Sequence, residues 1–88
     1  MNLAKAKKRI AKKIKMGNHG FPELSIEYLS VDGEPAREVV LCLVVEEGAE
    51  SMQERLPSKN DARENEVIQS AIVKMIERTG ANTVTLLQ

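Results

Sequence analysis

The stretch "REVVLCLVVEE", Arg37 to Glu47, sets the architecture, because it holds seven consecutive apolar residues from Val39 to Val45. Several of them are β-branched, and charged residues bound the run on both sides. Such a run predicts a strand that is covered on both faces and lies in the centre of a sheet. Two helices on one side of a small sheet would leave the other face of this strand wet. We therefore expect helices on opposite faces, or a second copy of the protein over an exposed face.

The segment before this run reads as its hairpin partner. In "LSIEYLS", residues 24–30, Leu24, Ile26 and Tyr28 alternate with polar residues, which is typical of a half-buried strand. The dipeptide Asp32-Gly33 that follows is a hairpin signal, since both central residues of a tight turn favour positive φ. The sequence therefore predicts two paired strands, at about 24–30 and 37–46.

The segment after the run predicts a helix and a last strand. Residues 47–59 are polar and acidic, and we expect a loop there, or at most a short helical fragment. A helix over about 60–79 follows, with Asp61 and Glu64 as its capping box and Gly80 at its end. Its apolar residues recur at helical spacing: Ile68, Ala71, Ile72, Met75 and Ile76. The alternating residues at about 83–87 predict a final strand.

These elements define the predicted fold class. With 88 residues, the chain is expected to form a single α+β domain over 1–88, in the order α-β-β-α-β. The sheet is predicted to be mixed and three-stranded, a β-hairpin plus a crossover strand packed with two helices. The connection through the second helix should be right-handed. The third strand would then run parallel to the second or pair beside the first.

The N-terminal segment predicts a basic amphipathic helix over about 3–16. Leu3, Ala6, Ile10 and Ile14 recur at helical spacing and form a narrow apolar stripe, which suits a helix that lies on a surface. Gly17 occupies the position just past the helix end. The cationic residues that we single out on the opposite side are Lys5, Lys8, Arg9, Lys12, Lys13 and Lys15.

The charge of this helix is balanced elsewhere in the chain. The whole sequence has 13 basic and 13 acidic residues and a net charge of zero. Residues 1–22 carry seven Lys and Arg and no acid, whereas residues 23–88 carry all thirteen acids against six bases. A split of this kind indicates contact with nucleic acid or a membrane, or charge complementarity between parts of the protein itself.

Two functions of different classes follow. The first is a small non-enzymatic protein-interaction or self-associating module, in which the basic helix meets another protein, a second copy of the chain as in a homodimer, or the chain's own acidic surface. That acidic surface is Glu46, Glu47, Glu50 and Glu54. The alternative is a nucleic-acid-associated accessory protein, whose lysines contact the phosphates of DNA or RNA without sequence specificity. We rank it second, because the net charge is zero and the stacking aromatics that single-strand binders use are nearly absent.

The loop Gly17–Gly20, "GNHG", resembles the Gly-x-x-Gly loop of KH domains, where the loop contacts a nucleic-acid backbone. The resemblance would make Asn18 and His19 backbone-contacting residues. KH domains continue with a helix after the loop, whereas Phe21-Pro22 and a predicted strand follow here. We therefore do not adopt the resemblance.

The sequence offers no set of residues for catalysis. His19 is the only histidine and lies in a polar loop, and Cys42 is the only cysteine and lies within the apolar strand, where a thiol stays protonated. Motifs for phosphate loops, dinucleotides, zinc or calcium are missing. We expect no enzymatic activity, no metal and no cofactor. No apolar run reaches the length of a membrane span, membrane-surface binding is disfavoured, and we expect a cytoplasmic protein.

Overall fold

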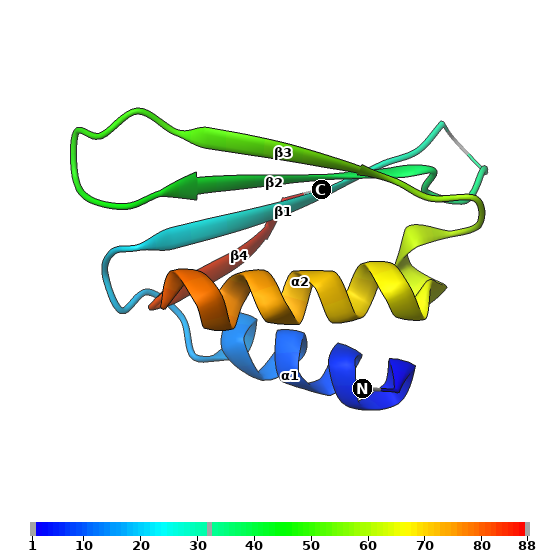
Figure 1. Ribbon diagram of the computed structural model, residues 1–88, viewed down its shortest axis with the longest axis horizontal. Coiled ribbons are helices and arrows are strands. Elements are labelled where there is room, and N and C mark those ends of the chain that lie inside the picture. Colours follow the sequence, from blue (N-terminus) through cyan, green and yellow to red (C-terminus); the bar gives the residue numbers. More distant parts are fainter. Residues whose placement is uncertain (1, 32, 88) are drawn as a thin grey trace.

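The protein is a small α+β structure with two helices and a four-stranded mixed sheet (Figure 1). The computed structural model describes residues 2–31 and 33–87. Its elements in chain order are α1 (Leu3–Lys15), β1 (Glu23–Leu29), β2 (Glu38–Val44), β3 (Met52–Pro57), the 3-10 turn η1 (Ala62–Glu64), α2 (Glu66–Thr79) and β4 (Thr83–Leu87).

The predicted central strand is β2, and it lies inside the sheet. The strand order is β3-β2-β1-β4, so β3 and β4 form the two edges. β2 pairs antiparallel with both β1 and β3, and in the first pair Ile26 faces Leu41. β4 pairs parallel with β1, where Leu24 faces Val84. The last strand therefore lies beside the first, which is one of the two placements predicted from the sequence.

The prediction of three strands and of the order α-β-β-α-β is wrong, because residues 52–57 form the additional edge strand β3. For this segment, "MQERLP", the sequence predicts a loop or a helical fragment. Five of its six residues are exposed, so it lacks the apolar alternation that reveals a half-buried strand. Its pairing with β2 supplies the backbone hydrogen bonds that its side chains do not predict.

The second helix begins later than the sequence predicts. Asp61 does not cap α2; it accepts a hydrogen bond from the Arg63 amide and caps η1 instead. The N-cap of α2 is Asn65, whose side chain accepts from the Ile68 amide at 3.2 Å. The start predicted at residue 60 is therefore wrong. Two residues that can cap a helix, Asp61 and Asn65, lie four positions apart, and only the turn between them decides which one begins the long helix.

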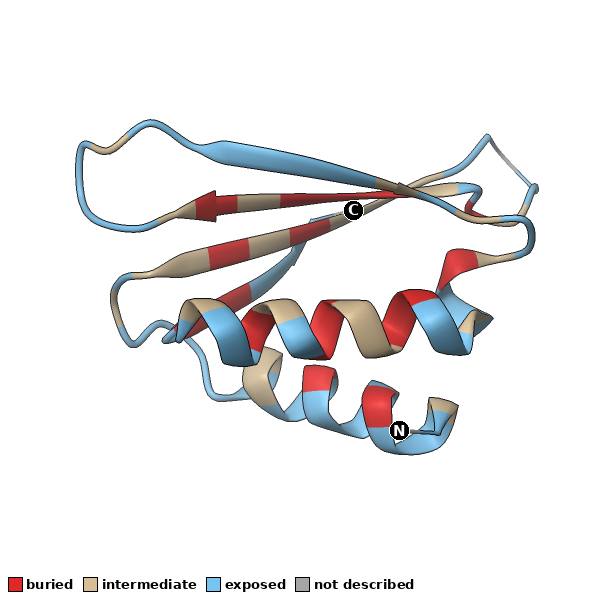
Figure 2. Ribbon diagram, viewed as in Figure 1, coloured by how far each residue is buried: buried red, intermediate tan, exposed pale blue. Residues whose placement is uncertain are grey.

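Both helices lie on the same side of the sheet (Figure 1). Their buried residues share one core cluster with the strand residues that point toward them (Figure 2). α1 contributes Ala6 and Ile10 to this cluster. α2 contributes Ile72 and β2 contributes Leu41, and both of these side chains are fully buried. The helices therefore do not cover opposite faces of the sheet, which was one of the two arrangements expected for the apolar run.

The opposite face of β2 has no helix over it. Alternation along the strand places Val40, Cys42 and Val44 on this open face, because Val39, Leu41 and Leu43 belong to the core. Val40 is still buried, whereas Cys42 and Val44 are half-buried. Neighbouring side chains of the sheet, among them the ion pair between Arg55 and Glu38 at 2.6 Å, partly shield this face.

Candidate functional site

The basic helix α1 is held to the protein by its apolar side. Ala6 and Ile10 are buried in the core, and Ile14 packs against it. The helix begins at Asn2, whose side chain accepts from the Lys5 amide at 2.8 Å, and it ends before Gly17, which has a φ of 80°. α1 packs against α2 and β4, so it forms the outer layer at one edge of the helical side.

Some of the cations of α1 are neutralised by the chain itself. Lys7 Nζ forms an ion pair with Glu64 Oε1 at 2.7 Å, and Arg9 Nη1 pairs with Glu77 Oε1 at 3.5 Å. Lys13 Nζ donates a hydrogen bond to the Ala81 carbonyl at 3.2 Å. The acidic partners lie on η1 and α2. None of the ion pairs found among the described residues joins α1 to the predicted acidic surface of residues 46–54.

Four other lysines of α1 have no acidic partner in the described part of the chain. Lys5, Lys8, Lys12 and Lys15 are exposed, and among residues 2–31 and 33–87 they form no ion pair. Their spacing of three, four and three residues places them within an arc of about 80° and along about 15 Å of helix. We call these four residues the lysine stripe. It lies opposite Ala6 and Ile10, and no acidic residue of α1 interrupts it.

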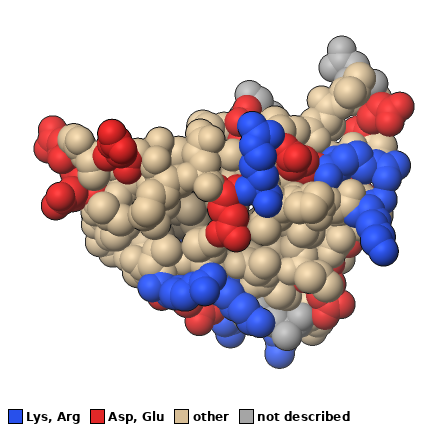
Figure 3. All heavy atoms as spheres, turned by 45° about the horizontal axis from the view of Figure 1, so that its top comes forward, with Lys and Arg blue, Asp and Glu red and all other residues tan. Residues whose placement is uncertain are grey.

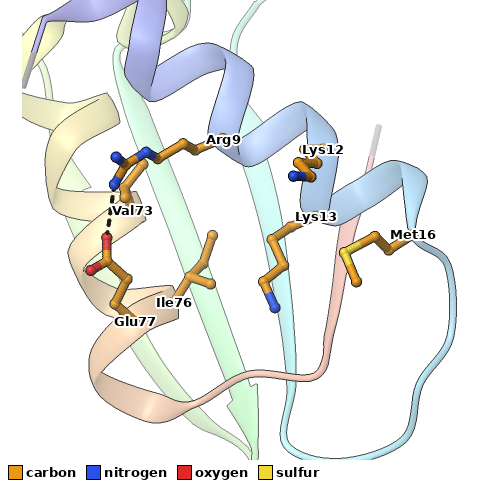
Figure 4. Close-up of a pocket in the computed structure, with 7 residues that line it drawn as sticks. All are labelled: Arg9, Lys12, Lys13, Met16, Val73, Ile76 and Glu77. Atoms are coloured by element: carbon orange, nitrogen blue, oxygen red, sulfur yellow. Dashed lines mark ion pairs between the residues drawn. The ribbon is translucent and has the colours of Figure 1, made fainter.

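A groove runs between α1 and α2 beside the lysine stripe (Figure 4). We call it the α1–α2 groove; it has a volume of about 390 Å³ and is lined by Arg9, Lys12, Lys13 and Met16 from α1 and by Val73, Ile76 and Glu77 from α2. Its lining is mostly apolar, because the aliphatic stems of the cations lie along it and their charged ends remain at its rim. Met16 is 50% exposed. The groove therefore combines an apolar wall with three positive charges and one carboxylate, that of Glu77, which pairs with Arg9.

The predicted acidic surface lies at the far end of a projecting hairpin. Glu46, Glu47 and Glu50 are in the loop between β2 and β3, Glu54 is on β3, and all four are exposed. The loop extends past the C-terminal end of α2 (Figure 1), and acidic side chains gather at this end of the molecule (Figure 3). Two apolar side chains flank the loop and are largely exposed, Val45 at 44% and Met52 at 55%.

The loop Gly17–Gly20 uses its amides within the chain. Gly17 N donates to the Ile14 carbonyl, His19 N to Thr83 Oγ1, and Gly20 N to Asn18 Oδ1. These three donors are therefore not directed at a phosphate, as a nucleic-acid clamp would require. The Nε2 atom of His19 lies within hydrogen-bond distance of the Met16 carbonyl oxygen, at 2.7 Å. The loop connects α1 to β1 along the chain, and its hydrogen bond to Thr83 attaches it to the edge strand β4. These bonds give the loop a structural role.

No group of three or more His, Cys, Asp and Glu side chains within residues 2–31 and 33–87 can hold a metal ion. In the same part of the chain, neither helix is long and apolar enough to cross a membrane.

Sequence reasoning missed several residues around α1. Lys7 was left out of the selected cations, although it forms the shortest ion pair of the helix, with Glu64. The sequence pattern places Glu64 in a capping box and gives no signal for Glu77. It indicates Met16 only as the end of the helix. Their roles depend on how α1 packs against α2, and helical spacing within one element carries no signal for that.

Comparisons of the chain with protein-family models, with curated proteins and with solved structures found no match.

Proposed function

We propose that this chain is a small non-enzymatic protein-interaction module that binds an acidic protein segment in the α1–α2 groove. The observation that carries the proposal is the pairing of apolar walls with a cationic rim in one groove. Apolar contacts that exclude water supply affinity, and complementary charges supply orientation and specificity. A segment that carries carboxylates beside a Leu, Val or Met side chain fits both properties.

The cost of the lysine arrangement supports a binding role. Lys5, Lys8, Lys12 and Lys15 are neighbours along one helix face, and like charges at these spacings destabilise a helix by about 0.2–0.5 kcal/mol per pair. None of the ion pairs among the described residues involves these four lysines. Features that lower stability in this way are commonly retained for function.

A labelled peptide tests this proposal. The probe is a fluorescein-labelled peptide of alternating Glu and Leu, and the control probe alternates Lys and Leu. Fluorescence anisotropy should show binding of the Glu-Leu peptide only. The groove variant Arg9→Glu/Lys12→Glu should weaken it at least about tenfold. The stripe variant Lys5→Glu/Lys8→Glu makes the same change of charge on the same helix outside the groove, and it should retain most of the affinity. Equal loss in both variants, or no binding at all at a protein concentration at which the chain is monomeric, would contradict the proposal.

A second candidate function is contact with nucleic-acid phosphates through the lysine stripe. The observation that favours it is the alignment of four exposed lysines without an acidic partner in the described chain. Four phosphate contacts predict a slope of about −3.6 for log K against log salt on duplex DNA, which is about a 150-fold loss between 50 and 200 mM salt.

Anisotropy with labelled duplex DNA, single-stranded DNA and RNA tests the second candidate. Here the stripe variant Lys5→Glu/Lys8→Glu should abolish binding, with the fold unchanged by circular dichroism. The groove variant also removes Lys12 from the lysine stripe, so it should weaken both kinds of binding. The stripe variant leaves the groove intact and therefore separates the two functions: it should abolish phosphate binding and retain binding of the Glu-Leu peptide. If no nucleic acid binds at about 50 mM salt, this candidate is excluded.

A further inference from the structure

We infer that the occupant of the α1–α2 groove is the acidic hairpin tip of a second copy of this chain, residues 45–52, so that the protein forms a reciprocal homodimer. This inference rests on the proposed function and names the partner of the same groove. It brings together a cationic groove and an acidic tip that belong to one molecule but do not meet within it.

The first step is the chemistry of the hairpin tip. Glu46, Glu47 and Glu50 lie between the two largely exposed apolar residues Val45 and Met52. Met52 pairs with Leu43 in the sheet register, so its side chain lies on the same face of the sheet as the helices. The loop of the tip projects past the end of α2 (Figure 1), whereas Met52 at its base also lines a cavity with Met75 of α2. It therefore presents carboxylates and apolar groups side by side.

The second step is the match to the groove. Arg9, Lys12 and Lys13 place three positive charges at its rim against the three carboxylates of the tip. Arg9 holds Glu77 at 3.5 Å, with both side chains more than half exposed, so this contact is weak and a carboxylate of the partner can compete for the guanidinium. Met16, half exposed at the groove, offers a flexible apolar contact for Val45 or Met52.

The third step is symmetry. The C-terminal ends of α1 and α2, which carry the groove, lie at the same end of the molecule as the hairpin tip (Figure 1). A two-fold axis at that end therefore allows each copy to place its tip in the groove of the other. Such an isologous contact closes on itself, and it makes the charge pairing twice.

Charge exchange between the two surfaces tests the inference. The groove variant Arg9→Glu/Lys12→Glu and the tip variant Glu46→Lys/Glu47→Lys should each be monomeric, because like charges then meet at both contacts. In a mixture of the two variants, the negative groove meets the positive tip and the native groove meets the native tip. An equimolar mixture should therefore restore the dimer. The stripe variant Lys5→Glu/Lys8→Glu should remain dimeric.

Sedimentation equilibrium measures these outcomes. Wild type should show twice the chain mass of 9.8 kDa at high concentration, and its dimer should weaken as salt is raised from about 50 to about 500 mM. The tip variant alters only exposed loop residues, so it should fold even if the groove variant does not. A wild type that stays monomeric, a tip variant as dimeric as wild type, or folded variants that fail to restore the dimer when mixed would overturn the inference. Binding of the Glu-Leu peptide by a monomeric protein would overturn the dimer alone and leave the proposed function standing.

Discussion

The backbone N–H of His19 donates a hydrogen bond to Thr83 Oγ1 at 2.9 Å, and this bond joins the loop after α1 to the first residue of β4. The Thr83 hydroxyl in turn donates to the Gly20 carbonyl at 2.7 Å. Thr83 is 2% exposed, so its hydroxyl is buried, and its two hydrogen bonds to the loop are partly buried. One buried hydroxyl thus positions the basic helix relative to the sheet.

The first prediction concerns this hydroxyl. Thr83→Val keeps the side-chain shape but removes both hydrogen bonds, so the free energy of unfolding should fall by about 1–3 kcal/mol. Urea denaturation measures the change. The control is Thr85→Val on the same strand, where the residue is exposed and the effect should stay within about 0.5 kcal/mol. Equal effects of the two substitutions would show that the Thr83 hydrogen bonds do not stabilise the loop.

The second prediction separates the apolar from the ionic attachment of α1. Ile10→Ala leaves a cavity in the core and should lower the free energy of unfolding by about 2–5 kcal/mol. Lys7→Ala removes an exposed ion pair with Glu64 and should cost at most about 1 kcal/mol. Thermal and urea unfolding of both variants give the comparison. If Lys7→Ala were the more damaging substitution, the helix would be held by charge.

The third prediction concerns a buried side-chain amide of α2, that of Gln69. Gln69 Nε2 donates to Tyr28 Oη at 2.8 Å and to the Ala62 carbonyl at 3.0 Å, and no polar side-chain atom buried among the described residues lacks a partner. Gln69→Leu should therefore cost about 1–3 kcal/mol. Combined with Tyr28→Phe, the loss should fall short of the sum by about 0.5–3 kcal/mol, because one bond is shared. A fully additive double variant would contradict this coupling. Gln53→Leu, on the exposed strand β3, is the matched control.

The fourth prediction concerns the lysine stripe. Lys8→Glu turns two repulsive pairs, with Lys5 and Lys12, into attractive ones, so the free energy of unfolding should rise by about 0.8–2 kcal/mol. Lys8→Gln removes only the repulsion and should give about half of this gain. Both variants are measured by thermal unfolding at low salt, and the gain should shrink at about 500 mM salt. A loss of stability in Lys8→Glu would mean that Lys8 serves the fold and not a partner.

Much of the fold follows from local patterns. The seven apolar residues from Val39 to Val45 indicate an interior strand, and alternation in 24–30 indicates its neighbour. The final strand has the bounds expected from its alternation, 83–87. β3 could not be predicted, because five of its six residues are exposed and only Leu56 packs against the core. Its pairing with β2 is a contact between backbones, which side-chain patterns do not reveal. The start of α2 was misplaced for a related reason: a cap is chosen by the turn that precedes it.

The sequence by itself determined that α1 is a basic amphipathic helix, that β2 is central and that the charges are divided between the two parts of the chain. These are properties of spacing and composition. Only the tertiary structure decided what the charges contact. Packing of α1 against α2 brings Glu64 to Lys7 and Glu77 to Arg9, leaves the lysine stripe without an acidic partner in the described chain, and forms the groove between the helices. The acidic loop is carried away from α1 by the β2–β3 hairpin. Helical spacing fixes which residues share a face, but the residue that a face meets depends on contacts between segments far apart in the chain.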